Sequence, residues 1–99
     1  MQYLSFELSE VADGISTLEA MASTAAAQHA AVMAEVQQVM HWAWCQFPKT
    51  QGPLDDGMDW DHELQVTVED GAWHTVTLTL TGSDRFVAAF LAHFDGSLA

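Results

Sequence analysis

Basic residues are almost missing from this sequence. Lys49 and Arg85 stand against fourteen Asp and Glu, so the formal net charge is −12 over 99 residues. A surface with this charge repels nucleic acid and anionic membranes, whereas it attracts basic proteins. The sequence therefore argues against nucleic-acid and membrane partners and favours a basic protein partner.

Cysteine and long apolar runs are also scarce. The single cysteine, Cys45, cannot form a disulfide within the chain. The longest apolar run, residues 86–92, is far shorter than the roughly 20 residues of a membrane-spanning helix. The N-terminal residues have neither the basic region nor the apolar stretch of a secretory signal. From these absences we expect a cytoplasmic protein.

The short motifs of the large enzyme classes are absent as well. The sequence contains no G-x-S-x-G, no H-E-x-x-H and no glycine-rich phosphate loop. Its densest group of carboxylates lies in a glycine-containing segment, where adjacent side chains rarely gain the burial that acid–base catalysis needs. We therefore predict a non-enzymatic protein with no catalytic residues and no cofactor.

What the sequence does contain is enough apolar material for a core. Hydrophobic residues make up 49% of the chain, and ten residues are aromatic. This content is ordinary for a globular protein and differs from the low hydrophobicity of disordered acidic chains. We predict a single acidic domain over residues 1–99.

The N-terminal half predicts one strand and one long helix. Apolar and polar residues alternate over 3–8, as in a half-buried strand, and Asp13-Gly14 then breaks the pattern. Residues 16–19 have the Ser-x-x-Glu spacing of a helix N-terminus. The Ala-, Met-, Glu- and Gln-rich segment from Thr17 to Phe47 favours a helix that ends before Pro48.

The length of that helix suggests a dimer. About thirty residues span about 45 Å, whereas a compact domain of this size is about 35 Å across. Either the helix bends or breaks around residues 22–25, where Ser and Thr weaken it, or one end contacts a second subunit. We expect a homodimer on this ground.

The C-terminal half predicts a loop, a hairpin and a short helix. Residues 49–62 hold one of the two prolines and four aspartates and directly follow the other proline, Pro48, which is typical of a loop. Apolar and polar residues alternate over 64–68 and again over 73–81, as in a hairpin with a threonine-rich second face. Ser83 or Asp84 begins a final helix, which Gly96 ends.

Together these elements predict an α+β fold in the order β-α-β-β-α. We expect a two-layer sandwich in which one long and one short helix cover one face of a three-stranded antiparallel sheet. The other face would be bare, and either water or a partner would cover it. The residues predicted to face the helices are Leu4, Phe6, Leu64, Val66, Val68, Val76, Leu78 and Leu80.

The acidic segment 55–63 is the predicted partner-binding site. It fails the calcium-loop template D-x-[DN]-x-[DN]-G, so we interpret it as a solvated loop that binds a basic protein surface, as an inhibitor, immunity or adaptor protein would. A tryptophan within it offers an anchor, because Trp commonly carries binding energy at interfaces. The predicted binding residues are Asp55, Asp56, Asp59, Trp60, Asp61 and Glu63.

Two alternatives remain beside this prediction. One is a homodimeric structural protein. The other is a small metal-dependent enzyme, because His41 and Cys45 are four residues apart on one helix face and His62 is a third candidate ligand. If these residues bind no metal, we instead expect Cys45 to be buried in the core.

Among the tryptophans, the spacing assigns Trp44 to the core and leaves three candidates for an exposed patch: Trp42, Trp60 and Trp73.

Overall fold

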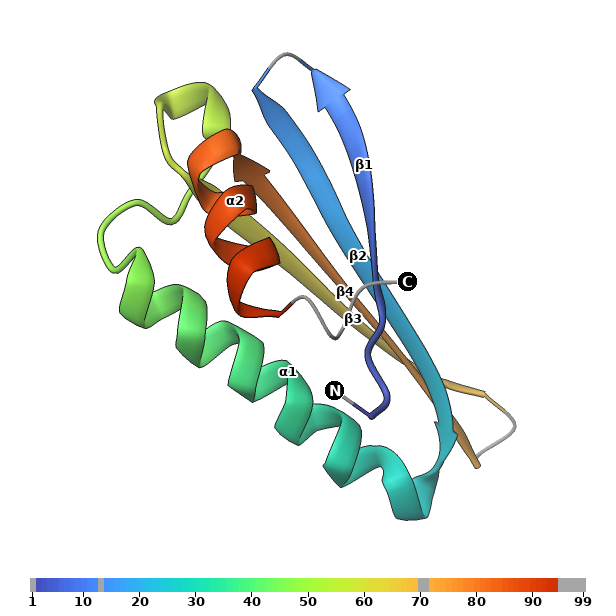
Figure 1. Ribbon diagram of the computed structural model, residues 1–99. Coiled ribbons are helices and arrows are strands. Elements are labelled where there is room, and N and C mark those ends of the chain that lie inside the picture. Colours follow the sequence, from blue (N-terminus) through green and yellow to red (C-terminus); the bar gives the residue numbers. More distant parts are fainter. Residues whose placement is uncertain (1, 13, 70–71, 95–99) are drawn as a thin grey trace.

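Four antiparallel strands form one sheet, and two helices lie on one of its faces (Figure 1). The computed structural model describes residues 2–12, 14–69 and 72–94. The strands lie side by side in the order β1-β2-β4-β3, so β1 and β3 are the edge strands. The elements are β1 Phe6–Ala12, β2 Ile15–Ala25, α1 Ala26–Gln46, the 3₁₀ turn η1 Leu54–Asp56, β3 Trp60–Glu69, β4 Trp73–Ser83 and α2 Asp84–His93.

The predicted α+β class, with an antiparallel sheet and two helices, is confirmed. The prediction of three strands in the order β-α-β-β-α is wrong, because residues 15–25 form β2 instead of the start of the helix. In this segment Leu18, Ala20 and Ala22 are buried and alternate with exposed residues, which is the period of a strand. The Ser-x-x-Glu spacing at 16–19 therefore lies inside β2 and caps no helix.

The helix that follows is shorter than predicted. α1 has 21 residues, which correspond to about 32 Å, and the longest dimension of the molecule is 40 Å. The helix fits within one subunit, so its length gives no reason to expect a dimer. Among the described residues, no helix has the length and apolar character needed to cross a membrane.

The C-terminal helix begins as predicted. The Ser83 hydroxyl accepts a hydrogen bond from the backbone N–H of Phe86 at 3.3 Å, which satisfies one of the unpaired donors at the helix start. α2 ends at His93, and the predicted stop at Gly96 lies outside the described residues.

An aromatic cluster fills the space between the helices and the sheet. The rings of Trp60 and Phe86 are stacked, with centroids 5.5 Å apart and planes 9° apart. Gly82 lies directly opposite Trp60 in the sheet, and a Cβ atom there would lie 2.5 Å from Cδ1 of Phe86. Glycine at position 82 therefore lets Phe86 contact the sheet closely.

A partly buried carboxylate contact ties the N-terminal segment to α1. The side chain of Glu35 accepts hydrogen bonds from the backbone N–H groups of Gln2, Tyr3 and Leu4 at 2.9–3.1 Å. Leu4, which the sequence assigns to the core, is 1% exposed. The contact fixes the path of the chain as it enters β1, which begins at Phe6 and not at residue 3.

Candidate functional site

The helix-free face of the sheet carries carboxylates and threonines. Side chains alternate between the two faces along a strand, so the neighbours of the buried strand residues point away from the helices. Glu7 lies directly opposite Glu19, and Thr79 lies between Glu19 and Glu63 in the same row. In β4 the predicted threonine column alternates with the buried residues, and it consists of Thr75, Thr77, Thr79 and Thr81.

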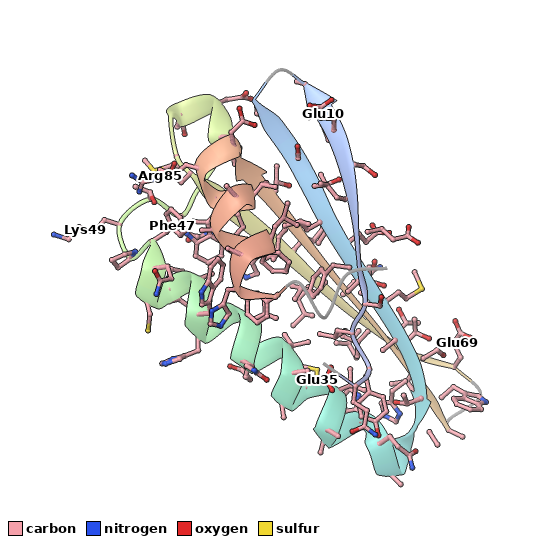
Figure 2. All side chains as sticks on the ribbon, viewed as in Figure 1. Glu10, Glu35, Phe47, Lys49, Glu69 and Arg85 are labelled. Atoms are coloured by element: carbon pink, nitrogen blue, oxygen red, sulfur yellow. The ribbon has the colours of Figure 1, made fainter. Side chains whose placement is uncertain are left out.

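No basic side chain balances these carboxylates. Figure 2 shows Lys49 and Arg85 near the end of α1 and the start of α2, well away from Glu69 on β3. These are the two basic residues of the whole sequence. Like charges that lie directly opposite each other destabilise a sheet, so the pair formed by Glu7 and Glu19 costs stability. The Thr79 hydroxyl donates to Glu19 Oε2 at 3.5 Å, but it does not neutralise the charge.

An open depression of about 420 Å³ lies at one end of this face. Its walls come from segments that are distant in the sequence, namely the end of β1 and the start of β2, the η1 region, and the paired residues Asp61 and Thr81 of β3 and β4. Most of the lining is apolar, and the charged groups are two carboxylates. The lining residues are Val11, Ala12, Ile15, Pro53, Leu54, Asp55, Asp61 and Thr81.

Local hydrogen bonds hold the η1 wall of the depression in place. The Asp56 N–H donates to the Pro53 carbonyl and the Gly57 N–H donates to the Leu54 carbonyl, each at 3.0 Å. Gly57 has φ of 83°, a left-handed conformation that glycine adopts without strain. This closed turn presents Leu54 and Asp55 to the depression.

The two carboxylates of the depression differ in their surroundings. Asp61 Oδ1 accepts hydrogen bonds from Gln51 Nε2 at 2.7 Å and from the backbone N–H of His62 at 2.9 Å. Asp55 is exposed to solvent. Asp61 is thus held in a fixed orientation, whereas Asp55 is free to turn towards a ligand. Both favour a cation, because a carboxylate attracts positive charge and its oxygens accept hydrogen bonds from it.

The six residues of the predicted acidic binding segment do not form one cluster. Asp55 and Asp61 meet at the depression, while Glu63 lies further along β3 on the helix-free face. Asp56 is exposed on η1 but is not part of the lining. Asp59 instead forms an ion pair with Arg85 at 3.3 Å.

Trp60 is part of the core. It is 0% exposed, and its indole N–H donates to the backbone carbonyl of Phe47 at 3.1 Å. The indole is therefore inaccessible to a partner, and the expectation of an anchor at this position is wrong. β3 begins at Trp60, within the segment 49–62 predicted as a loop, and its first side chain points to the helix side.

The other tryptophans also correct the sequence prediction. Trp42, predicted for the exposed patch, is 8% exposed, whereas Trp44, predicted for the core, is 43% exposed. Trp73 is 49% exposed, as expected. The exchange between Trp42 and Trp44 follows from the placement of α2, because the Trp42 ring packs against Phe90 of that helix.

The weak metal candidates are not assembled into a site. Cys45 Sγ lies 3.6 Å from His41 Nε2, and Cys45 is exposed rather than buried. His62 contacts the rings of Trp44 and Trp60 instead. Over residues 2–12, 14–69 and 72–94, no group of three His, Cys, Asp or Glu side chains is arranged to hold a metal ion.

Sequence reasoning missed the pair of Glu7 and Glu19, because it predicted a helix for the segment in which β2 sets Glu19 opposite Glu7. It also missed that the apolar face of β3 is uncovered: Leu64, Val66 and Val68 are 39%, 44% and 55% exposed.

No protein-family model matches the chain, and comparisons with curated proteins and with solved structures give no match.

Proposed function

We propose that this chain is a non-enzymatic protein-interaction domain that binds a basic protein surface, as inhibitor, immunity and adaptor proteins do. The observation that carries the proposal is the helix-free face with its uncompensated carboxylates, above all the direct pair of Glu7 and Glu19. A basic partner would neutralise this pair and remove the repulsion. Complementary charge also speeds the encounter of two proteins and selects the partner.

The depression supports the same function in more detail. A Lys or Arg side chain has an apolar stem and a charged head. Pro53, Leu54 and Ile15 offer an apolar wall for the stem, and Asp55 and Asp61 offer oxygens for the head. Asp61 is already hydrogen-bonded and Asp55 is solvated, and the oxygens of both can accept hydrogen bonds from the charged head. This proposal keeps the predicted basic partner and two of the predicted residues.

A matched pair of variants tests the proposal. Asp55 and Asp56 are neighbours on η1, yet only Asp55 lines the depression. Partners captured on the immobilised chain from an extract of its native cell would be identified and purified, and their affinities measured. We expect Asp55→Asn to weaken binding about tenfold, since hydrogen bonds to charged groups contribute roughly 1.5–3 kcal/mol, and Asp56→Asn to have little effect.

The salt dependence completes this test. Binding of a basic partner should weaken as the ionic strength rises from about 0.05 M to about 0.3 M, because salt screens exposed charges. Partners of acidic or neutral charge, or an affinity that neither salt nor Asp55→Asn changes, would contradict the proposal.

A further inference from the structure

The outer edge of β3 has backbone groups without a strand beside them. The N–H and C=O of Trp60 point away from β4, since they bond to Thr50 O at 3.3 Å and to the N–H of Gly52 at 2.8 Å. Along a strand the direction of these groups alternates with every residue. The N–H and C=O of Leu64, Val66 and Val68 therefore point outward too, and none of them has a backbone partner elsewhere in the described residues.

The same three residues present an apolar stripe. Leu64 lies opposite Leu78 and Val66 opposite Val76, so their side chains share the helix side of the sheet. α1 lies over β2 and β4 and reaches β3 through Trp44, which contacts Trp60 and His62 at the start of the strand. Beyond that point the stripe is uncovered, and the half-exposed Trp44 continues it onto α1.

The other side of β3 is acidic. Glu63 and Glu69 are exposed and point to the helix-free side, with Gln65 and Thr67 between them. The edge therefore combines free hydrogen-bonding groups, an apolar stripe on one side and two carboxylates on the other. An unprotected edge of this kind is a template for pairing with another strand.

We propose that the β3 edge binds an extended segment of a basic partner protein as a fifth strand of the sheet. Apolar side chains at alternating positions of that segment contact Leu64, Val66 and Val68, and Lys or Arg side chains six residues apart lie opposite Glu63 and Glu69. The inference rests on the proposed function for the sign of the partner's charge. The free edge and the apolar stripe support strand addition independently.

A second copy of this chain fits the edge less well. Antiparallel pairing of two β3 strands that sets Val66 opposite Val66 also sets Leu64 opposite Val68 and Glu63 opposite Glu69. The dimer would then contain two Glu–Glu pairs between chains of formal charge −12 each, and like charges directly opposite each other are unfavourable. Shifting the register by two residues removes the Glu–Glu pairs but loses part of the apolar contact.

A designed peptide tests this inference directly. The probe is Lys-Val-Thr-Val-Thr-Val-Lys with blocked ends, which in antiparallel register sets lysine opposite Glu63 and Glu69. Hydrogen exchange of the backbone amides is followed by NMR as the peptide is added. We expect exchange at Leu64, Val66 and Val68 to slow at least about tenfold, since paired amides are protected. The same peptide with Glu in place of Lys is the charge control.

A proline variant separates edge pairing from adsorption by charge. Val66→Pro removes one outward N–H, a change that edge strands accept because the lost donor faces solvent, and it should abolish the protection. Should that variant fail to fold, Val66→Lys serves the same purpose by placing charge in the stripe.

The outcomes distinguish this inference from the proposed function. Peptide binding that shifts signals of Glu7, Glu19 and Asp55 without protecting the β3 amides would overturn strand addition and leave the acidic interaction surface standing. The absence of protection at saturating peptide also overturns it. Protection of the same amides that rises with protein concentration in the absence of peptide would mean that a second copy is the occupant and would overturn the choice of partner.

Discussion

The two edge strands of the sheet begin alike and then differ. Each starts with a buried aromatic residue, Phe6 in β1 and Trp60 in β3, which are 1% and 0% exposed. After that, β1 has a register shift between Glu10 and Ala12, and Glu10 lies opposite the buried Ser16 on the helix side. A bulge and a charge on the inner side are both devices by which proteins protect a sheet edge.

β3 has neither device. It pairs with β4 over ten residues without a register shift, and its sequence contains no proline or lysine. On the helix side it carries Leu64, Val66 and Val68, where β1 carries Leu8 and Glu10. Attachment to the core and edge protection are therefore separate properties: both strands begin with a buried aromatic residue, and only β1 carries devices that oppose further pairing.

The greatest loss of stability should come from replacing Trp60, the buried residue at the start of β3. Trp60→Ala should lower the free energy of unfolding by about 3–5 kcal/mol, because it removes a fully buried aromatic side chain and its hydrogen bond to Phe47. Trp73→Ala, at a half-exposed position of β4, should cost less than about 1 kcal/mol. Urea unfolding of both variants measures the contrast, and equal losses would contradict the assigned role of Trp60.

A smaller effect is expected at the entry to β1. Glu35→Gln keeps the shape of the side chain but removes the charge that three backbone N–H groups share. We expect a loss of about 1–3 kcal/mol in the free energy of unfolding and faster amide exchange at Tyr3 and Leu4. Glu10→Gln is the control, because Glu10 is exposed. Unchanged exchange at Leu4 in Glu35→Gln would show that this contact does not hold the segment.

The smallest effect is a gain in stability. Glu7→Gln removes one partner of the like-charged pair with Glu19 and should raise the free energy of unfolding by about 0.2–1 kcal/mol. Glu69→Gln is a matched control, because Glu69 lies opposite Trp73 and not opposite a carboxylate. Thermal unfolding at low and moderate salt measures both, and the difference should shrink as salt screens the pair. A loss of stability in Glu7→Gln would mean that the repulsion is absent.

The sequence predicted the elements whose local signals agree with their packing. The alternation over 64–68 and 73–81 corresponds to β3 and β4, and Ser83 marks the start of α2 through its hydroxyl. β2 was missed because its helix-side positions include the small residues Ala20 and Ala22. Their helix propensity hid a period of two, and tertiary packing overrode that propensity.

The candidate site was predictable in charge but not in position. The acidic composition predicted the sign of a partner's charge. In the folded chain, however, the residues of the predicted segment 55–63 lie in different places. β3 begins inside that segment, so Trp60 turns to the core while Asp61 turns to the opposite face. Asp59 forms an ion pair with Arg85, a residue that lies 26 positions away and that no local pattern connects to it. Whether a strand lies at an edge depends on the order of the whole sheet, which local alternation does not contain.

The most direct test of the open β3 edge compares one substitution on each edge. Val66 and Leu8 are similarly exposed apolar residues, at 44% and 47%, and both lie on the helix side. The affinity of Val66→Lys and of Leu8→Lys for the basic alternating peptide would be measured against the unchanged chain. We expect Val66→Lys to weaken binding at least about tenfold, since lysine on an edge strand opposes pairing, and Leu8→Lys to leave it within about twofold. Equal losses, or a larger loss in Leu8→Lys, would contradict the account.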